Sequence, residues 1–132
     1  MSFLLDTDTC SAHLKGDSRV FTRLIQHSGG LHVSVLSLCE LYSWVLRRNA
    51  PQRRLESLEQ MISDMRVVEV DATVARNGGE LRADMLDRGK PIATVDLLIA
   101  ATAITHDLTV VTHNQRHFSL VPDLRIEDWL VP

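Results

Sequence analysis

Short apolar segments alternate with longer amphipathic ones along this chain, and this alternation limits the fold more than any other feature. Four short apolar runs, at 3–5, 31–34, 67–70 and 109–112, have the length of buried strands, and 124–126 is a candidate fifth. Segments with apolar residues at helical spacing separate these runs. Because parallel strands need crossover connections, the alternation predicts an α/β fold with helices on both faces of a mostly parallel sheet of four to five strands.

Length and segment composition predict a single domain, 1–132, without a membrane segment. A chain of 132 residues can enclose a hydrophobic core without further support. Its start lacks the basic and apolar regions of a signal peptide, and no stretch approaches the roughly 18 apolar residues of a spanning helix. We therefore expect a cytoplasmic protein. Cys10 and Cys39 lie in apolar surroundings without zinc-type or CxxC spacing, which predicts two buried free thiols.

The charge balance excludes one class of function. A formal net charge of −3 argues against a protein that coats nucleic acid through overall positive charge. Local patches would have to provide any such contact, and a solvated helix face explains them about as well as a ligand does. The densest patch consists of Arg47, Arg48, Arg53 and Arg54. The candidate RNA-contacting residues are Arg47, Arg88, Lys90, His113 and Arg116.

Polar side chains follow three of the predicted strands. Asp6 ends the first strand, Ser34 the second and Thr112 the fourth, with His113 and Asn114 just beyond. In an open α/β sheet, ligands collect outside the carboxyl ends of the strands. The sequence therefore predicts a site where these three strand ends converge.

Two acids interrupt segments that are otherwise apolar and helical. Glu40 lies within the predicted helix 36–48, and Asp96 lies in the first turn of a helix that we expect Thr94 to cap. Each has an ordinary explanation, since Glu40 can sit at the edge of an apolar stripe and Asp96 can interact with the helix dipole. If Asp6, Glu40 and Asp96 gather, they repel one another unless protons or a cation neutralise them. Carboxylates suit Mg²⁺ or Mn²⁺, whose chemistry here would be phosphodiester hydrolysis.

Four motifs follow one another along the chain. They are Phe-Leu-Leu-Asp-Thr-Asp at 3–8, Ser-Val-Leu-Ser-Leu-Cys-Glu-Leu-Tyr at 34–42, Gly-Lys-Pro-Ile-Ala-Thr-Val-Asp and its apolar continuation at 89–103, and Val-Thr-His-Asn-Gln-Arg-His-Phe at 111–118. In this order they resemble the motifs of VapC-like PIN domains, ribonuclease toxins of type II toxin–antitoxin pairs. The resemblance spans nearly the whole chain, and the segment around Asp96 is its most specific part.

The resemblance implies a three-layer PIN fold and an endoribonuclease that depends on Mg²⁺ or Mn²⁺ and cleaves structured RNA, with transfer RNA or ribosomal RNA as the expected substrate. It also implies a homodimer, inhibited by a cognate VapB-like antitoxin. The matching metal-binding acids are Asp6, Glu40 and Asp96, with Ser37 and Thr112 as supporting hydroxyls.

Two positions depart from the pattern of the family. Asn114 falls near the place of a fourth acid in many PIN domains, which leaves a second metal ion open, although its carbonyl can still serve as a ligand. Asp8 is often Asn in the family, and its carboxylate either helps to hold the metal or caps the first helix. We expect capping.

Two other functions remain open at this point. A buried strand followed by Asp6 and Asp8 also resembles the start of haloacid-dehalogenase-type phosphatases, but Cys10 departs from that motif and no downstream lysine motif follows. A catalytically idle PIN scaffold that acts only by binding a partner is the second alternative. Metal-dependent RNA cleavage separates it from a toxin.

Overall fold

A parallel sheet of five strands, in the order β3-β2-β1-β4-β5, forms the centre of the molecule in a computed structural model that describes residues 1–131. Its strands are β1 (Phe3–Leu5), β2 (Leu31–Ser34), β3 (Arg66–Val68), β4 (Thr109–Val111) and β5 (Ile126–Glu127). The helices are α1 (Thr7–Leu14), α2 (Ser18–Gln26), α3 (Val35–Val45), α4 (Gln52–Ser63), α5 (Ala72–Asp87), α6 (Thr94–His106) and α7 (Gln115–Phe118). All four strand pairings are parallel, so the predicted α/β class and strand number are confirmed.

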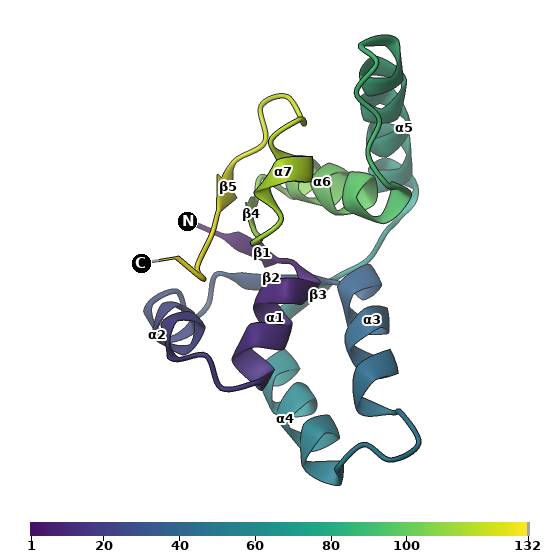
Figure 1. The fold of residues 1–132 in the computed structure, drawn as a ribbon. Helices are drawn as coiled ribbons and strands as arrows, with labels where there is room; N and C mark the ends of the chain where they lie inside the picture. Colours follow the sequence, from purple (N-terminus) through teal and green to yellow (C-terminus); the bar gives the residue numbers. More distant parts are fainter. Residues whose placement is uncertain (132) are drawn as a thin grey trace.

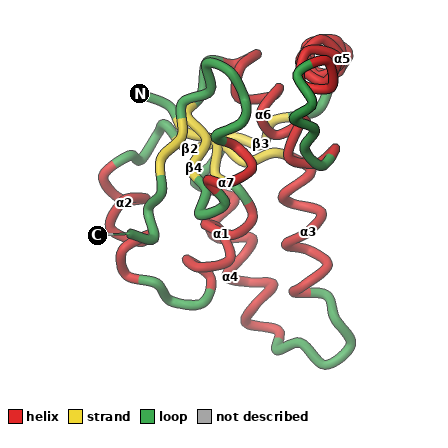
Figure 2. Tube along the Cα trace, turned by 45° about the horizontal axis from the view of Figure 1, so that its top comes forward, coloured by secondary structure: helices red, strands yellow, loops and turns green. Residues whose placement is uncertain are grey.

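Helices cover both faces of the sheet (Figure 1, Figure 2), and each face has its own hydrophobic core. Successive side chains of a strand point to opposite faces, so Phe3 and Leu5 enter one core while Leu4 enters the other. Helices α1 to α4 supply most of the first core, and α5 to α7 most of the second. The result is the expected three-layer arrangement.

The register of the central strand determines where the polar residues lie. Leu5 pairs with Val33 of β2 on one side and with Val111 of β4 on the other. The next residue of each strand is therefore at the same edge of the sheet: Asp6 lies between Ser34 and Thr112. The convergence expected from the sequence is confirmed.

Helices α5 and α6 approach each other closely because small residues face each other. A Cβ atom added at Gly78 of α5 would lie 3.5 Å from the Cβ atom of Ala101 in α6. Asn77, next to this glycine, donates from Nδ2 to Thr105 Oγ1 over 2.8 Å, which links the two helices. Within residues 1–131, neither these helices nor any other combine the length and apolar character needed to cross a bilayer.

Some local predictions are wrong. Strand β3 begins one residue earlier than expected and β5 is displaced to Ile126–Glu127. Thr94 is the first residue of α6 and Ala93 is its N-cap, because the Thr94 hydroxyl accepts a hydrogen bond from Arg82 instead of capping the helix. Cys10 is buried, as predicted, but Cys39 is exposed, since it lies on the outer side of α3 beside Glu40.

Candidate active site

Asp6 leads directly from the central strand into α1. Its Oδ1 accepts a hydrogen bond from the backbone N–H of Thr7 over 2.8 Å, so Asp6 is the N-cap of this helix. Its other oxygen, Oδ2, lies 3.0 Å from the Thr112 hydroxyl at the end of β4. Two neighbouring elements therefore hold the carboxylate of Asp6 in one orientation.

Asp8 reaches across to the end of β4 and does not cap α1. Its Oδ2 accepts from the backbone N–H of His113 over 3.0 Å and lies 3.3 Å from Thr112 Oγ1. The expectation that Asp8 caps the first helix is thus wrong, because Asp6 takes that place. The single proton of the Thr112 hydroxyl serves Asp6 or Asp8 at any moment, which places these two carboxylates side by side.

Glu40 joins this group through a neighbour on α1. Helix α3 begins directly after β2, where the Ser34 hydroxyl accepts from the Leu36 N–H over 3.1 Å. This start places the exposed Glu40 beside α1, where its Oε1 accepts from Thr7 Oγ1 over 2.9 Å. The Glu40 carboxylate is therefore accessible from solvent and still fixed relative to Asp6.

Asp96 is held by His117, a residue of α7. His117 Nδ1 lies 3.1 Å from Asp96 Oδ2 and also 3.1 Å from Asn114 Nδ2. An Nδ1 that carries a hydrogen donates to Asp96, whereas an Nδ1 without one accepts from Asn114, so the ring makes one of the two hydrogen bonds at a time. Asn114 in turn donates its backbone N–H to Thr112 Oγ1 over 3.0 Å. Thr112 thus connects Asn114 with Asp6, and His117 lies between Asn114 and Asp96.

The electrostatics of the site favour a bound cation. The pKa of Asp6 is raised from 3.8 to about 6, mainly by burial and then by the nearby negative charges of Asp8 and Asp96. Hydrogen bonds from Thr7 and Thr112 only partly oppose this. A proton or a metal ion relieves the repulsion between these carboxylates.

The donor set fits a hard divalent cation. Mg²⁺ takes oxygen ligands, keeps several of its waters and needs only one or two protein carboxylates. As they stand, no three His, Cys, Asp or Glu side chains of residues 1–131 are close enough together to form a ready-made metal cage. An ion that retains part of its hydration shell needs fewer direct protein ligands. The candidate ligands are Asp6, Asp8, Glu40 and Asp96.

The structure separates the other predicted residues into two groups. Thr112 and Asn114 belong to the hydrogen-bonded network, whereas the buried Ser37 hydroxyl has no hydrogen-bond partner among the described residues. The His113 ring lies 2.9 Å from Asp128, and Arg88 pairs with Asp84 over 3.1 Å. The other predicted RNA-contacting side chains are exposed, and they are Arg47, Lys90 and Arg116.

Two members of the site were not found from the sequence. The Thr7 hydroxyl donates a hydrogen bond to Glu40, and the His117 ring contacts Asp96. Neither residue type alone marks a residue as part of the site. The spacing between Asn114 and His117 was a usable signal, because three residues apart in a helical turn places two side chains together. Nothing near Thr7 in the sequence indicates Glu40, which is 33 positions away.

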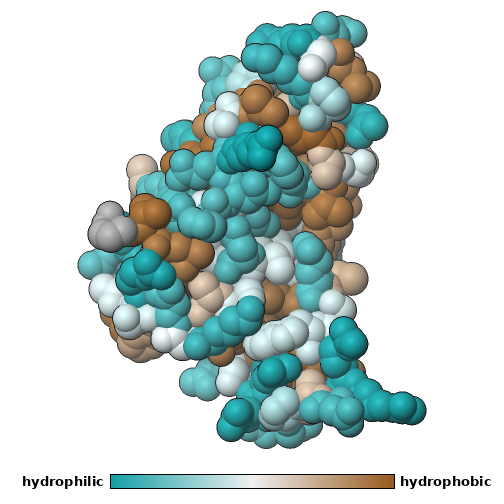
Figure 3. All heavy atoms as spheres, viewed as in Figure 1, coloured by the Kyte–Doolittle hydropathy of each residue, from teal (hydrophilic) through white to brown (hydrophobic). Residues whose placement is uncertain are grey.

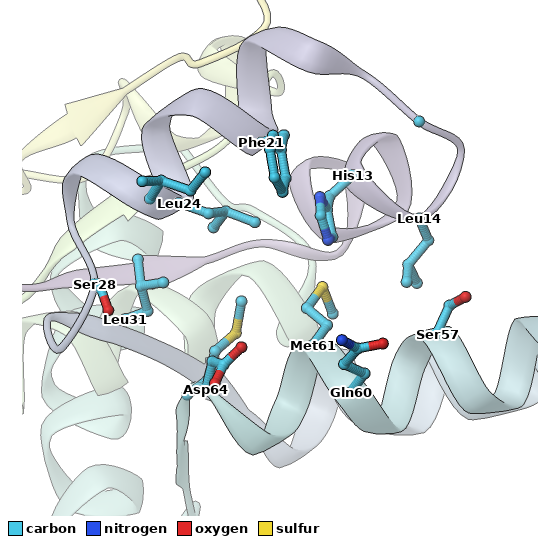
Figure 4. Close-up of a pocket in the computed structure, with 13 residues that line it drawn as sticks. His13, Leu14, Phe21, Leu24, Ser28, Leu31, Ser57, Gln60, Met61 and Asp64 are labelled. Carbon is cyan, nitrogen blue, oxygen red and sulfur yellow. The ribbon is translucent and has the colours of Figure 1, made fainter.

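A cavity lies away from the carboxylates, between α1, α2 and α4. Figure 4 shows a lining that combines apolar side chains, such as Leu24 and Met61, with polar ones, such as Gln60 and Asp64, and its volume is about 540 Å³. The rings of His13 and Phe21 stack nearly parallel at its wall, with 4° between their planes. Phe21 is 52% exposed, so an apolar side chain is accessible from solvent at the wall of this cavity.

Comparison with known proteins agrees with this geometry. The PIN domain family matches residues 3–124. The chain is 34% identical to the tRNA(fMet)-specific endonuclease VapC of Salmonella typhimurium over 98% of both chains. It superposes on the crystal structure of DNA-bound VapBC from Salmonella typhimurium with a TM-score of 0.90, at 34% identity and 98% coverage of both chains. For VapBC2 from Rickettsia felis, bound to a DNA fragment from its promoter, the TM-score is 0.89 at 27% identity, covering 98% of this chain and 99% of the other. The chain belongs to the PIN-domain family and, within it, to the VapC group.

Proposed function

We propose that this protein is an endoribonuclease toxin of a VapBC-type toxin–antitoxin module and that Mg²⁺ or Mn²⁺ is its cofactor. The observation that carries the proposal is the gathering of Asp6, Asp8, Glu40 and Asp96 at one edge of the sheet, linked by Thr7, Thr112 and His117. VapC relatives that match nearly the full length of this chain are named as ribonucleases, which supports the same reaction. The whole chain then acts as one PIN domain.

Each residue of the site has a distinct task in this reaction. Asp6, Glu40 and Asp96 would hold the ion, with Asp8 beside them, and Asn114 offers a carbonyl oxygen. A bound ion of this kind activates water and stabilises negative charge on phosphate oxygens. Thr112 keeps Asp6 and Asp8 oriented, Thr7 keeps Glu40 oriented and His117 keeps Asp96 oriented. Such hydrogen-bonded support commonly changes metal affinity or activity by about tenfold to a hundredfold.

Structured RNA, in the form of transfer RNA or ribosomal RNA, is the proposed substrate. Transfer RNA has the stronger support, because a relative with 34% identity is named for a specific tRNA. Arg116 of α7, next to His117, is an exposed cation that can meet phosphates, and Lys90 is a second exposed cation in the segment between α5 and α6. His113 and Arg88 are weaker candidates, because each already pairs with an acid.

A VapB-like antitoxin is the proposed regulating partner, in the cytoplasm. The solved VapBC structures with 27% and 34% identity support this assignment. The cavity between α1, α2 and α4 suits an apolar antitoxin segment, because Phe21 and Ile25 beside it are exposed. A homodimer is proposed from the family resemblance.

Cleavage of bulk bacterial transfer RNA and ribosomal RNA by antitoxin-free protein tests the proposal. Wild type is compared with Asp96→Asn, which keeps the shape of the side chain and removes its charge. Asp87→Asn is the matched control, since Asp87 is an exposed acid at the end of α5. Discrete fragments that require Mg²⁺ or Mn²⁺ and that only wild type and the control produce are the expected result.

Two outcomes would contradict the proposal. Equal cleavage by wild type and Asp96→Asn would remove Asp96 from the site. Absence of cleavage by folded, metal-loaded wild type would favour the idle scaffold that acts by binding. The phosphatase alternative loses its basis because the chain belongs to the PIN family and Asp6 is oriented within a network that includes Glu40 and Asp96.

A further inference from the structure

The end of the hairpin formed by α3 and α4 concentrates positive charge. Figure 3 shows mainly hydrophilic side chains there, at the bottom of the view. Around the ring of Trp44, this basic end contains Lys15, Arg47, Arg48, Arg53 and Arg54. Five of the 14 lysines and arginines of the chain are therefore collected on one small surface of a protein whose net charge is −3.

These cations lack acidic partners, unlike several other arginines of the protein. Arg19, Arg76, Arg88 and Arg125 each form an ion pair with an aspartate or glutamate. Across the described chain, no such pair involves a residue of the basic end. Two hollows flank Trp44, of about 420 and 370 Å³, and the residues that line them include no acid.

One guanidinium group is held in place by an aromatic ring. The Cζ atom of Arg54 lies 4.5 Å from the centroid of the Trp44 ring, and Lys15 Nζ lies 5.9 Å from the same centroid. A stacked guanidinium keeps its N–H groups free at the edge, where they can bind the two oxygens of a phosphate. Because the stack already restricts Arg54, binding costs less side-chain entropy.

The basic end is continuous with the carboxylate site along two helices. Trp44 follows Glu40 by four residues on α3, so both lie on one face of the helix, about 6 Å apart along its axis. Helix α1 runs beside α3, and its first residue, Thr7, contacts Glu40 while Lys15, just after its end, lies near Trp44. The seam where α1 contacts α3 therefore extends from Glu40 to the basic end.

We propose that this basic end is an RNA-backbone site that holds a second segment of the substrate while the acids act on the scissile phosphate. The inference rests on the proposed ribonuclease function and adds where the RNA is gripped. The negative charge of a ribose–phosphate chain complements the positive charge of this surface. Its successive phosphates can lie along the seam between α1 and α3. The arginines and lysine bind those phosphates, and the exposed edge of Trp44 contacts a sugar or base.

The test compares two triple variants with the same net charge. The tip variant carries Arg47→Gln, Arg48→Gln and Arg53→Gln. The control variant carries Arg23→Gln, Arg66→Gln and Arg76→Gln, three exposed arginines on α2, β3 and α5. Both are placed in an Asp96→Asn background, and binding to fluorescein-labelled bulk transfer RNA is followed by anisotropy in chelator over a range of salt.

We expect the tip variant to bind about tenfold more weakly than the control at moderate salt. Three lost phosphate contacts should also make the plot of log K against log salt shallower by about 2, while the control keeps the slope of its parent. In the active background, kcat/KM should fall for transfer RNA and stay unchanged for a short oligonucleotide that spans only the scissile bond. A second variant, Arg54→Lys, keeps the charge and removes the planar fork, and it should lose part of the affinity.

Two outcomes would overturn this proposal. Equal RNA affinities and salt slopes for the tip and control variants show that the arginines form only a solvated surface. Unchanged RNA binding with lost binding of the antitoxin assigns the basic end to an acidic protein segment instead. The ribonuclease function fails separately, if wild type with metal leaves every RNA intact, so the two failures are distinguishable. Circular dichroism of both triple variants establishes that they are folded.

Discussion

The hydroxyl of Thr7 donates a hydrogen bond to Glu40 over 2.9 Å and so ties the start of α1 to the middle of α3. Replacement by Val removes the hydroxyl at nearly constant shape, which frees the exposed Glu40 carboxylate to rotate. We expect Thr7→Val to reduce RNA cleavage by about tenfold, mainly through weaker metal affinity. Metal titrations of activity measure this effect. Thr7→Ser, which keeps the hydroxyl, should retain activity, and Thr22→Val, the same change on α2, should leave activity intact. Full activity of Thr7→Val would show that Glu40 does not depend on this hydrogen bond.

His117→Ala removes the ring that orients Asp96. The expected loss in kcat is about tenfold to a hundredfold, with little change in the free energy of unfolding, because the ring is half exposed. Single-turnover cleavage and denaturant titration separate the two quantities. His106→Ala, an exposed histidine at the end of α6, is the control. Equal kinetics of the two variants would leave His117 without a role.

Asp6→Asn is expected to stabilise the metal-free protein while abolishing cleavage. The amide oxygen can accept from the Thr7 N–H. The amide nitrogen can donate to Thr112 Oγ1, which reverses the direction of that hydrogen bond and leaves the Thr112 hydroxyl to donate to Asp8. It also removes a charge that burial and Asp8 disfavour. Urea titrations in chelator at about pH 7.5 should show a gain of up to about 3 kcal/mol, which corresponds to the difference between a pKa of 3.8 and one of about 6. Lower stability of the variant would contradict this account of Asp6.

The pH dependence of the stability of wild type and Asp6→Asn tests the direction of the pKa shift of Asp6. The folded-state pKa of Asp6 is raised, so its contribution to stability is fully present below pH 3.8 and is lost as the pH rises through about 6. Wild type and Asp6→Asn should therefore have similar stability near about pH 4 and diverge as the pH rises to about 7.5. Adding Mg²⁺ at the higher pH should stabilise wild type alone, because the variant lacks the ligand. A difference that is constant with pH would disprove the titration of Asp6.

Phe21→Glu should weaken binding of the antitoxin and leave RNA cleavage intact. The change places a charge at the wall of the cavity between α1, α2 and α4. Co-purification with the small protein encoded beside the toxin gene measures the effect. Leu86→Glu is the matched control, with a side chain 51% exposed against 52% for Phe21. Equal loss of antitoxin in both variants would show that the cavity is not its docking site.

Sequence patterns predicted the layers and strand ends of this fold because they depend on local properties. Apolar runs such as Phe3-Leu4-Leu5 can be recognised within a few residues, and the acids that follow or interrupt such runs were found in the same way. The partners of those acids were not predictable, since Thr7 meets Glu40 only after α1 and α3 have packed together. Cys39 was assigned to the wrong side of its helix for a related reason: the apolar stripe of α3 is broad, and packing alone decides where it ends.

The central position of β1 has a consequence for the synthesis of a toxic enzyme. Asp6 is made early, but β4 and the Thr112 that orients it come from the last quarter of the chain, after Asp96. A nascent chain that has not yet reached Thr112 cannot complete the sheet around β1, so it carries no assembled site. The order of the strands thereby delays the assembly of the candidate site until β4 has been made.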